Sequence, residues 1–199
     1  MNPSFQKRKL AEHIESYVTL VKNKCLTSAA FRKFWQDYPQ TSSKNLTIKI
    51  GEIGFSKAMV KAGFKIGALS RRRFFIEEID KRSDAFLEKT LKYAAYSDEY
   101  LQNAGLAVLV KERDSNWRHA ALDHIHEVVE RRRFNASFCW ATEQIVATTF
   151  IKKHPGRIFQ IGRLRFLEAV EGDDIICDNK AALLELRAQI DRDFGMGKP

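Results

Sequence analysis

The alternation of apolar and polar positions changes character about a third of the way along the chain. Before residue 73 it mixes helical periodicity with short β-branched runs. Helices are predicted over residues 4–15, 29–38 and 44–62. Strands are predicted at residues 17–21 and 64–69. Hydroxyl residues that favour helix N-caps stand at Ser4, Thr27-Ser28 and Thr41-Ser42-Ser43, and Gly63 is placed to end the third helix.

After residue 73 the pattern becomes mostly helical. Amphipathic or apolar helices are predicted over residues 74–92, 115–132, 136–151 and 181–194, with one short strand at 158–161. The sequence therefore predicts a single α/β, helix-rich domain over residues 1–199. Its α/β part covers residues 1–73 and its mainly helical part covers residues 74–199.

Composition narrows the class of protein. Of 199 residues 44% are apolar and 30% are charged, which is typical of a globular chain and not of a disordered one. No apolar run reaches the ~18–20 residues of a membrane-spanning helix, and the charged start lacks the apolar core of a secretory signal. The three scattered cysteines show no paired spacing, so we expect no disulfide framework, no zinc site and a cytoplasmic location.

The positive charge is concentrated in the first third of the chain. Residues 1–73 contain 15 Lys or Arg against 4 acids, a net charge of +11, whereas residues 74–199 contain 19 against 21. A basic segment of this kind favours an anionic partner: a nucleotide, a phospholipid surface, a phosphorylated substrate or a nucleic acid. A solvated basic face without a dedicated partner explains the charge equally well.

One acid stands out in the most informative stretch, Gly51–Ile66. Glu52 precedes about ten helical residues, after which Gly63 leads into the predicted strand. A carboxylate beside a cleft can act as a general base toward an acceptor hydroxyl in sugar transfer. A carboxylate near a helix start can also simply stabilise the helix dipole, and spacing alone favours this second interpretation.

Three segments in order resemble a known family. They are His13–Lys22, Ser28–Trp35 and Gly51–Ser56, which contain an H-I-E-S-Y strand entry, an F-x-x-F-W helix and an E-I-G-F-S helix. Together they resemble the rhamnan synthesis protein F family of polysaccharide glycosyltransferases. The likeness extends over residues 13–69 and, more weakly, over residues 134–153.

The resemblance implies a partial GT-A-like mixed sheet and transfer of a sugar from a nucleotide sugar to a growing cell-surface glycan acceptor. Glu52 would then be the catalytic base. Substrate binding would fall to His13, Phe31, Phe34, Trp35, Asn135, Lys152 and Lys153. The aromatic residues could instead pack in a core, and the lysines could instead be solvated surface charges.

The donor half of such an enzyme is not visible in this sequence. There is no Gly-rich phosphate loop, and no Asp-x-Asp motif precedes Glu52; Asp173-Asp174 reads as a simple turn. We therefore expect an acceptor-side module, either completed by a partner chain or without catalysis of its own. If a donor site is completed, Mn²⁺ or Mg²⁺ would be its cofactor, and the basic part would suit peripheral contact with an anionic membrane.

Two other sets of residues point to other functions. His119, Asp123, His126 and Glu127 share a helical face, but a polar surface explains them better than a metal site, and we predict no metal ligands. Arg71–Arg73 and Arg131–Arg133, each followed by a phenylalanine, favour nucleic acid as an alternative partner. The arginines could equally cap helix C-termini.

Overall fold

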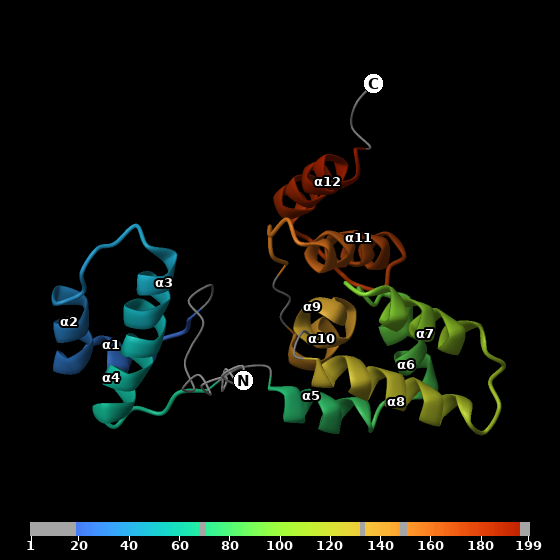
Figure 1. Ribbon diagram of the computed structural model, residues 1–199, viewed down its shortest axis with the longest axis horizontal. Helices are drawn as coiled ribbons and strands as arrows, with labels where there is room; N and C mark the ends of the chain where they lie inside the picture. The colour runs from blue at the N-terminus through green and yellow to red at the C-terminus, as the bar shows by residue number, and fades with distance from the viewer. Residues whose placement is uncertain (1–18, 68–70, 132–133, 148–150, 196–199) are drawn as a thin grey trace, which may run out of the picture. The chain divides into compact units, whose positions relative to one another are not determined.

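The structure, a computed structural model, describes residues 19–67, 71–131, 134–147 and 151–195. The chain divides into two compact units, Met1–Leu69 and Ser70–Pro199. We refer to them as the N-terminal unit and the C-terminal unit and describe each by itself. Every regular element in the described ranges is a helix (Figure 1).

The predicted α/β class, with its GT-A-like mixed sheet, is therefore wrong. In the N-terminal unit, residues 19–22 and 64–67 have no regular structure. A β-branched run becomes a strand only where another strand can pair with it, and no strand occurs in the described part of either unit. Residues 17, 18, 68 and 69 of the two predicted strands, and the helix expected over 4–15, lie outside the described residues.

The third predicted strand, 158–161, lies inside a helix. It forms the first turn of α11 (Arg157–Glu171), whose buried residues include Ile158, Gly162, Phe166 and Leu167. Ile158, Gly162 and Phe166 follow one another at intervals of four residues, which is the spacing of one helical face. The helical periodicity over the whole of α11 therefore predicts its structure better than the short apolar run at 158–161 does.

The N-terminal unit contains α1 (Asn23–Leu26), α2 (Ala29–Gln36), α3 (Lys44–Thr47), a π-helical segment η1 (Ile48–Gly54) and α4 (Phe55–Lys61). The last three follow one another without interruption, so the helix predicted over 44–62 is confirmed. The hydroxyl oxygens of Ser28 and Ser43 accept hydrogen bonds from the backbone N–H groups of Phe31 and Leu46, at 3.1 and 3.4 Å. Gly63 ends α4 with φ = +86°.

The C-terminal unit is a helical assembly of eight described helices. Besides α11 they are α5 (Arg72–Ile79), α6 (Asp84–Lys92), α7 (Glu99–Val110), α8 (Trp117–Glu130), α9 (Phe134–Ser137), α10 (Cys139–Val146) and α12 (Lys180–Phe194). The single helix expected over 74–92 is two helices, because Ser83 caps a new one by accepting from the N–H of Phe86. The helix expected over 136–151 ends earlier, where Ala147 adopts φ = +51°.

The core of the C-terminal unit lies among α5, α6, α8, α10 and α11. Its largest fully or almost fully buried side chains include Trp117, Phe75, Phe138 and Ile125. Asp174, in the turn after α11, ties distant segments to this core: its backbone carbonyl accepts from the indole N–H of Trp140 at 3.0 Å. The turn predicted at Asp173-Asp174 is thus present and is part of the packing.

Candidate functional site

An aromatic cluster organises the N-terminal unit. Phe55, at the start of α4, is buried, and three side chains of α2 surround it with ring centroids at 5.8 Å for Phe31, 5.2 Å for Phe34 and 5.7 Å for Trp35. Tyr38 extends the cluster at 5.4 Å from Trp35. The spacing of residues 31, 34 and 35 places their rings along one side of α2, and Tyr38 follows just after its end.

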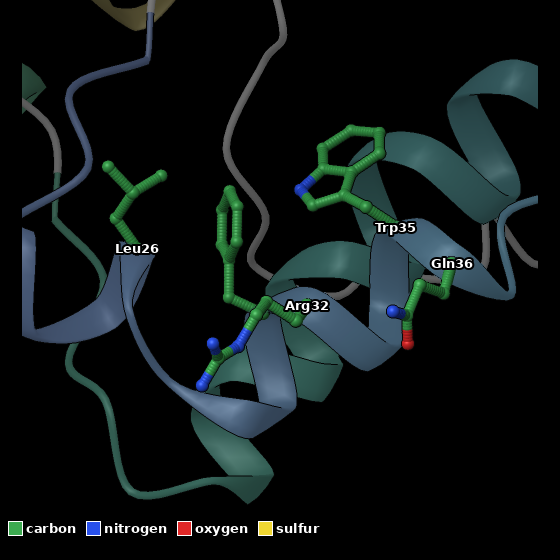
Figure 2. A pocket seen from close by; sticks show the side chains of 5 residues that line it. Leu26, Arg32, Trp35 and Gln36 are labelled. Carbon is green, nitrogen blue, oxygen red and sulfur yellow. The ribbon is translucent and has the colours of Figure 1, made fainter.

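The cluster leaves a shallow hollow on its outer side. The hollow has a volume of about 380 Å³ and is lined by Leu26, Phe31, Arg32, Trp35 and Gln36. Figure 2 shows the side chains of Leu26 on α1 and Trp35 on α2, with the polar ends of Arg32 and Gln36 directed away from the indole. The side chain of Trp35 is 47% exposed. The hollow therefore combines an exposed aromatic face with two polar side chains.

Two neighbouring cations of α2 differ in their surroundings. Lys33 is paired with Asp37, with 2.8 Å between Nζ and Oδ2. Arg32 has no carboxylate partner among the described residues. Its guanidinium is thus available to a ligand in the hollow.

Glu52 lies in the π-helical segment and not at a helix N-terminus. The helical stretch begins at Lys44, two turns before Glu52. The helix dipole stabilises a carboxylate only in the first turn, so the dipole interpretation of Glu52 does not apply. Short π-helical segments often coincide with functional sites. Glu52 is half-buried, and it is not among the residues that line the hollow.

The glycine before Glu52 allows a close approach to the side chain of Tyr38, just after α2. A Cβ at Gly51 would lie 3.0 Å from the hydroxyl oxygen of Tyr38, so any side chain there would force this contact apart. The E-I-G part of the motif is thus packed against the same aromatic cluster that forms the hollow. Gly54 likewise lies beside Phe34.

The remaining predicted substrate-binding residues have different positions. His13 lies outside the described residues. Asn135 is exposed on α9, and Lys152 and Lys153 precede α11, so all three belong to the C-terminal unit. Lys153 forms an ion pair with Glu185 of α12, and the Lys152 ammonium lies 5.7 Å from the ring centroid of Phe159.

The backbone around these lysines is held by a buried arginine. Arg163 is 1% exposed and donates from Nη1 to the carbonyl oxygens of Lys152 and His154 at 2.5 and 3.3 Å. Its Nε and Nη2 donate to one carboxylate oxygen of Asp193 at 2.8 and 2.5 Å. Burial alone would raise the pKa of Asp193, but the hydrogen bonds from Arg163 and Gln189 outweigh it and lower the pKa. This arrangement is structural, because it joins the segment before α11 to α12.

The histidines of the candidate metal cluster lie beside carboxylates. His119 lies 3.2 Å from Asp123, and His126 lies 2.8 Å from Asp80 on α5's C-terminal side. Within the described ranges no three metal-ligating side chains come together. The geometry of the described residues therefore does not support a metal site.

Three of the four described arginines of the two triplets lie beside carboxylates. Arg72 lies 3.4 Å from Glu130, and Arg73 lies 2.7 Å from Glu77. Arg131 forms ion pairs with two carboxylates, those of Asp98 and Glu127. Phe134 packs on Phe75 at 5.0 Å and is not free to stack on a base. Arg132 and Arg133 lie outside the described residues.

Sequence reasoning identified two of the five residues that line the hollow. Phe31 and Trp35 were expected at a binding site from the family resemblance, whereas Leu26, Arg32 and Gln36 were missed. The signal for the last two was present, since residues 32 and 36 lie one turn apart and flank Trp35. Phe34, which was expected at the site, instead packs inward on Phe55.

Comparison with known proteins relates the first part of the chain to a described family. Residues 2–97 match the family model described as rhamnan synthesis protein F, which confirms the resemblance over that segment. No curated protein and no solved structure matches the chain. None of the helices in the described ranges has the length and apolarity to span a lipid bilayer.

Proposed function

Because the chain is rhamnan synthesis protein F-like over residues 2–97, we propose that it is the acceptor-side module of a glycosyltransferase of rhamnan-type polysaccharide synthesis. The single observation that carries this proposal is the hollow beside Trp35, which lies within the matched segment. A half-exposed indole bordered by polar side chains is suited to a sugar ring, whose apolar face packs on the indole while its hydroxyl groups take hydrogen bonds.

Each residue of the hollow has a distinct role in this proposal. Trp35 supplies the packing surface and is held in place by its contacts with Phe34 and Phe55. The Arg32 guanidinium donates to hydroxyl oxygens of the sugar, and the Gln36 amide can both donate and accept. A site built on a helix whose inner face is packed in this way is already organised before the ligand binds.

Glu52 is the base in the same proposal. Its carboxylate would take the proton of the acceptor hydroxyl as that oxygen attacks the anomeric carbon of the donor sugar. A partner chain would supply the nucleotide-sugar site, and a Mn²⁺ or Mg²⁺ ion bound there would neutralise the leaving diphosphate. The position of Glu52 in a π-helical segment, next to the Gly51–Tyr38 contact, supports this role.

The basic surface fits an acceptor that is presented at a membrane. Residues 19–67 contain nine Lys or Arg against two acids, a net charge of +7, and all nine cationic side chains are exposed. Lysines near an anionic bilayer contribute about 1 kcal/mol each to its attraction. We expect salt-sensitive binding to anionic vesicles; stronger binding to single-stranded nucleic acid at the same salt concentration would favour the nucleic-acid alternative.

Tryptophan fluorescence tests the sugar site directly. Trp117 and Trp140 are 2% and 4% exposed, so Trp35 is the tryptophan whose emission an external ligand can alter. Titration with rhamnose oligosaccharides should give a saturable change in emission, and Trp35→Phe should abolish it. Val60→Ala is the matched control, because Val60 is 51% exposed on α4 and does not line the hollow. Absence of a saturable change, or equal loss of binding in Val60→Ala, would refute the sugar site.

Glu52→Gln separates binding from transfer. In a transfer assay with the donor partner, this variant should lose activity while its oligosaccharide affinity stays unchanged, because the amide cannot accept the proton. Transfer at the parent rate would show that Glu52 is not the base.

A further inference from the structure

The C-terminal unit contains a cavity of its own. It has a volume of about 120 Å³ and lies where the N-terminal end of α7 meets α8, α9 and α11. Its apolar wall consists of Leu101, Val128 and Ile158, all of them buried. An engineered cavity of about 150 Å³ binds benzene, so this one has room for a group of about five or six heavy atoms.

A serine of α9 brings an unpaired hydroxyl group to this cavity. Ser137 is 3% exposed and lines the cavity, and its Oγ forms no hydrogen bond with any residue that the structure describes. The backbone of Ser137 is fixed, since its carbonyl oxygen accepts from the N–H of Ala95 at 2.7 Å. Buried hydroxyl groups are ordinarily hydrogen-bonded, so this one lacks a partner that a ligand in the cavity could supply.

A tyrosine contributes a second hydroxyl group. The Tyr96 side chain lines the cavity, and its hydroxyl oxygen lies 3.0 Å from Nε2 of His124. Burial lowers the pKa of His124, so its imidazole is neutral at pH 7 and either donates to Tyr96 or accepts from it. In both cases the Tyr96 hydroxyl keeps one hydrogen-bonding function for a further group. Gly105 leaves the space for this pair, because a Cβ there would lie 2.7 Å from the Tyr96 oxygen.

The charged residues of the cavity are already paired with each other. Asp98 Oδ2 accepts from Nη1 of Arg131 at 3.2 Å, and Asp98 Oδ1 accepts from the N–H of Leu101. Arg131 also donates to Glu127 at 2.9 Å. A charged ligand would have to compete with these pairs, so the cavity favours an uncharged one.

We propose that this cavity binds the hydroxylated edge of a small neutral polyol, either a free polyol or part of a sugar ring. Two neighbouring hydroxyl groups of the ligand bond to Ser137 and Tyr96, and its carbon atoms pack on the apolar wall. An apolar lining with a few converging polar groups is typical of small-molecule sites. Sugar binding at the hollow beside Trp35 is not required for this site, because the two share no residue.

Amide NMR of the full chain tests the proposal. The Trp35→Phe variant is used, so that the outcome does not depend on the hollow. Glycerol and L-rhamnose, titrated separately, represent the free polyol and the sugar ring. At least one of them should shift the amide signals of residues 96–101 and 137 saturably, with a dissociation constant on the order of 1–10 mM. Inorganic phosphate should not, and saturable binding of phosphate that is tighter than that of both compounds overturns the proposal.

Removal of single hydroxyl groups shows whether the cavity is the site. Ser137→Ala should weaken binding by about 3–10-fold, which corresponds to one net hydrogen bond. Thr142→Val is the matched control, because Thr142 is also buried with an unpaired hydroxyl group but does not line the cavity. Circular dichroism verifies that both variants are folded. The proposal is overturned if neither compound saturates these signals below about 100 mM, if Ser137→Ala binds as the parent does, or if Thr142→Val weakens binding equally.

Discussion

The ion pair between Arg163 and Asp193 gives the most sharply defined stability prediction. The side chains are 1% and 7% exposed, so the Asp193→Ala variant leaves a guanidinium buried with only two backbone carbonyls as acceptors. Breaking a buried pair by removing one partner costs about 3–5 kcal/mol. With a urea m-value of about 2 kcal/mol/M for a unit of this size, the unfolding midpoint should fall by about 2 M.

The assay follows the C-terminal unit alone. In a Trp35→Phe background the emission comes from Trp117 and Trp140, both buried in this unit, and it reports the urea transition. Glu185→Ala is the matched control. Its partner Lys153 belongs to the same segment that Arg163 holds, but both side chains are exposed, at 65% and 58%, and the midpoint should not change measurably.

The pH dependence supplies a second readout of the same pair. The pKa of Asp193 in the folded chain lies below its ordinary value of 3.8. Stability from this group is therefore present above that value and is lost as the pH falls through the folded pKa. The difference in free energy of unfolding between the parent chain and the Asp193→Ala variant should narrow over the same pH range. If Asp193→Ala shifts the midpoint no more than Glu185→Ala does, the reasoning about the buried pair is refuted.

Three further predictions concern buried groups of the C-terminal unit. Gly105→Ala should lower the free energy of unfolding by about 1–3 kcal/mol in a urea titration, because its Cβ would lie 2.7 Å from the hydroxyl oxygen of Tyr96. Burial lowers the pKa of His124, so an NMR titration should show it protonating below its ordinary 6.5, and its contribution to stability should be lost as the pH falls below that value. Burial raises the pKa of the Cys139 thiol to about 12, so a thiol reagent at pH 8 should modify the other two cysteines of the native chain and spare Cys139 until urea is added.

The sequence predicts well those helices whose ends have clear chemical signals. Ser28 and Ser43 cap the helices that they were expected to cap, Gly63 ends α4, and Gly195 ends α12 with φ = +69°. These signals are local, since a cap or a left-handed glycine depends on a few neighbouring residues.

Elements whose identity depends on distant packing are predicted poorly. The helix α7 has apolar residues on both faces and therefore shows no clear period, so the sequence gives no sign of it. The predicted strands failed for the same reason, because strand formation requires a partner that a short β-branched run does not reveal.

The hollow could be anticipated only in part. The spacing of Phe31 and Trp35 marks an aromatic face on α2, but which ring turns inward depends on where Phe55 packs. The burial of Arg163 likewise has no sequence signal, since an isolated arginine is ordinarily exposed. Both features arise from contacts between helices that are separate in the chain.

The turn at Asp174 has a consequence for the order in which the chain matures. Its carboxylate bonds to Lys89 and Tyr93 of the α6 region, more than 80 residues earlier, at 2.5 and 2.6 Å. A ribosome adding roughly 5–20 residues per second makes this partner on the order of ten seconds after α6 has been synthesised. During that interval the Tyr93 hydroxyl lacks its native acceptor, and so does the Trp140 indole once Trp140 itself has been made. The bonds that join α6 to the turn after α11 therefore form last, whereas α7 and α8, which also pack on α6, are synthesised earlier.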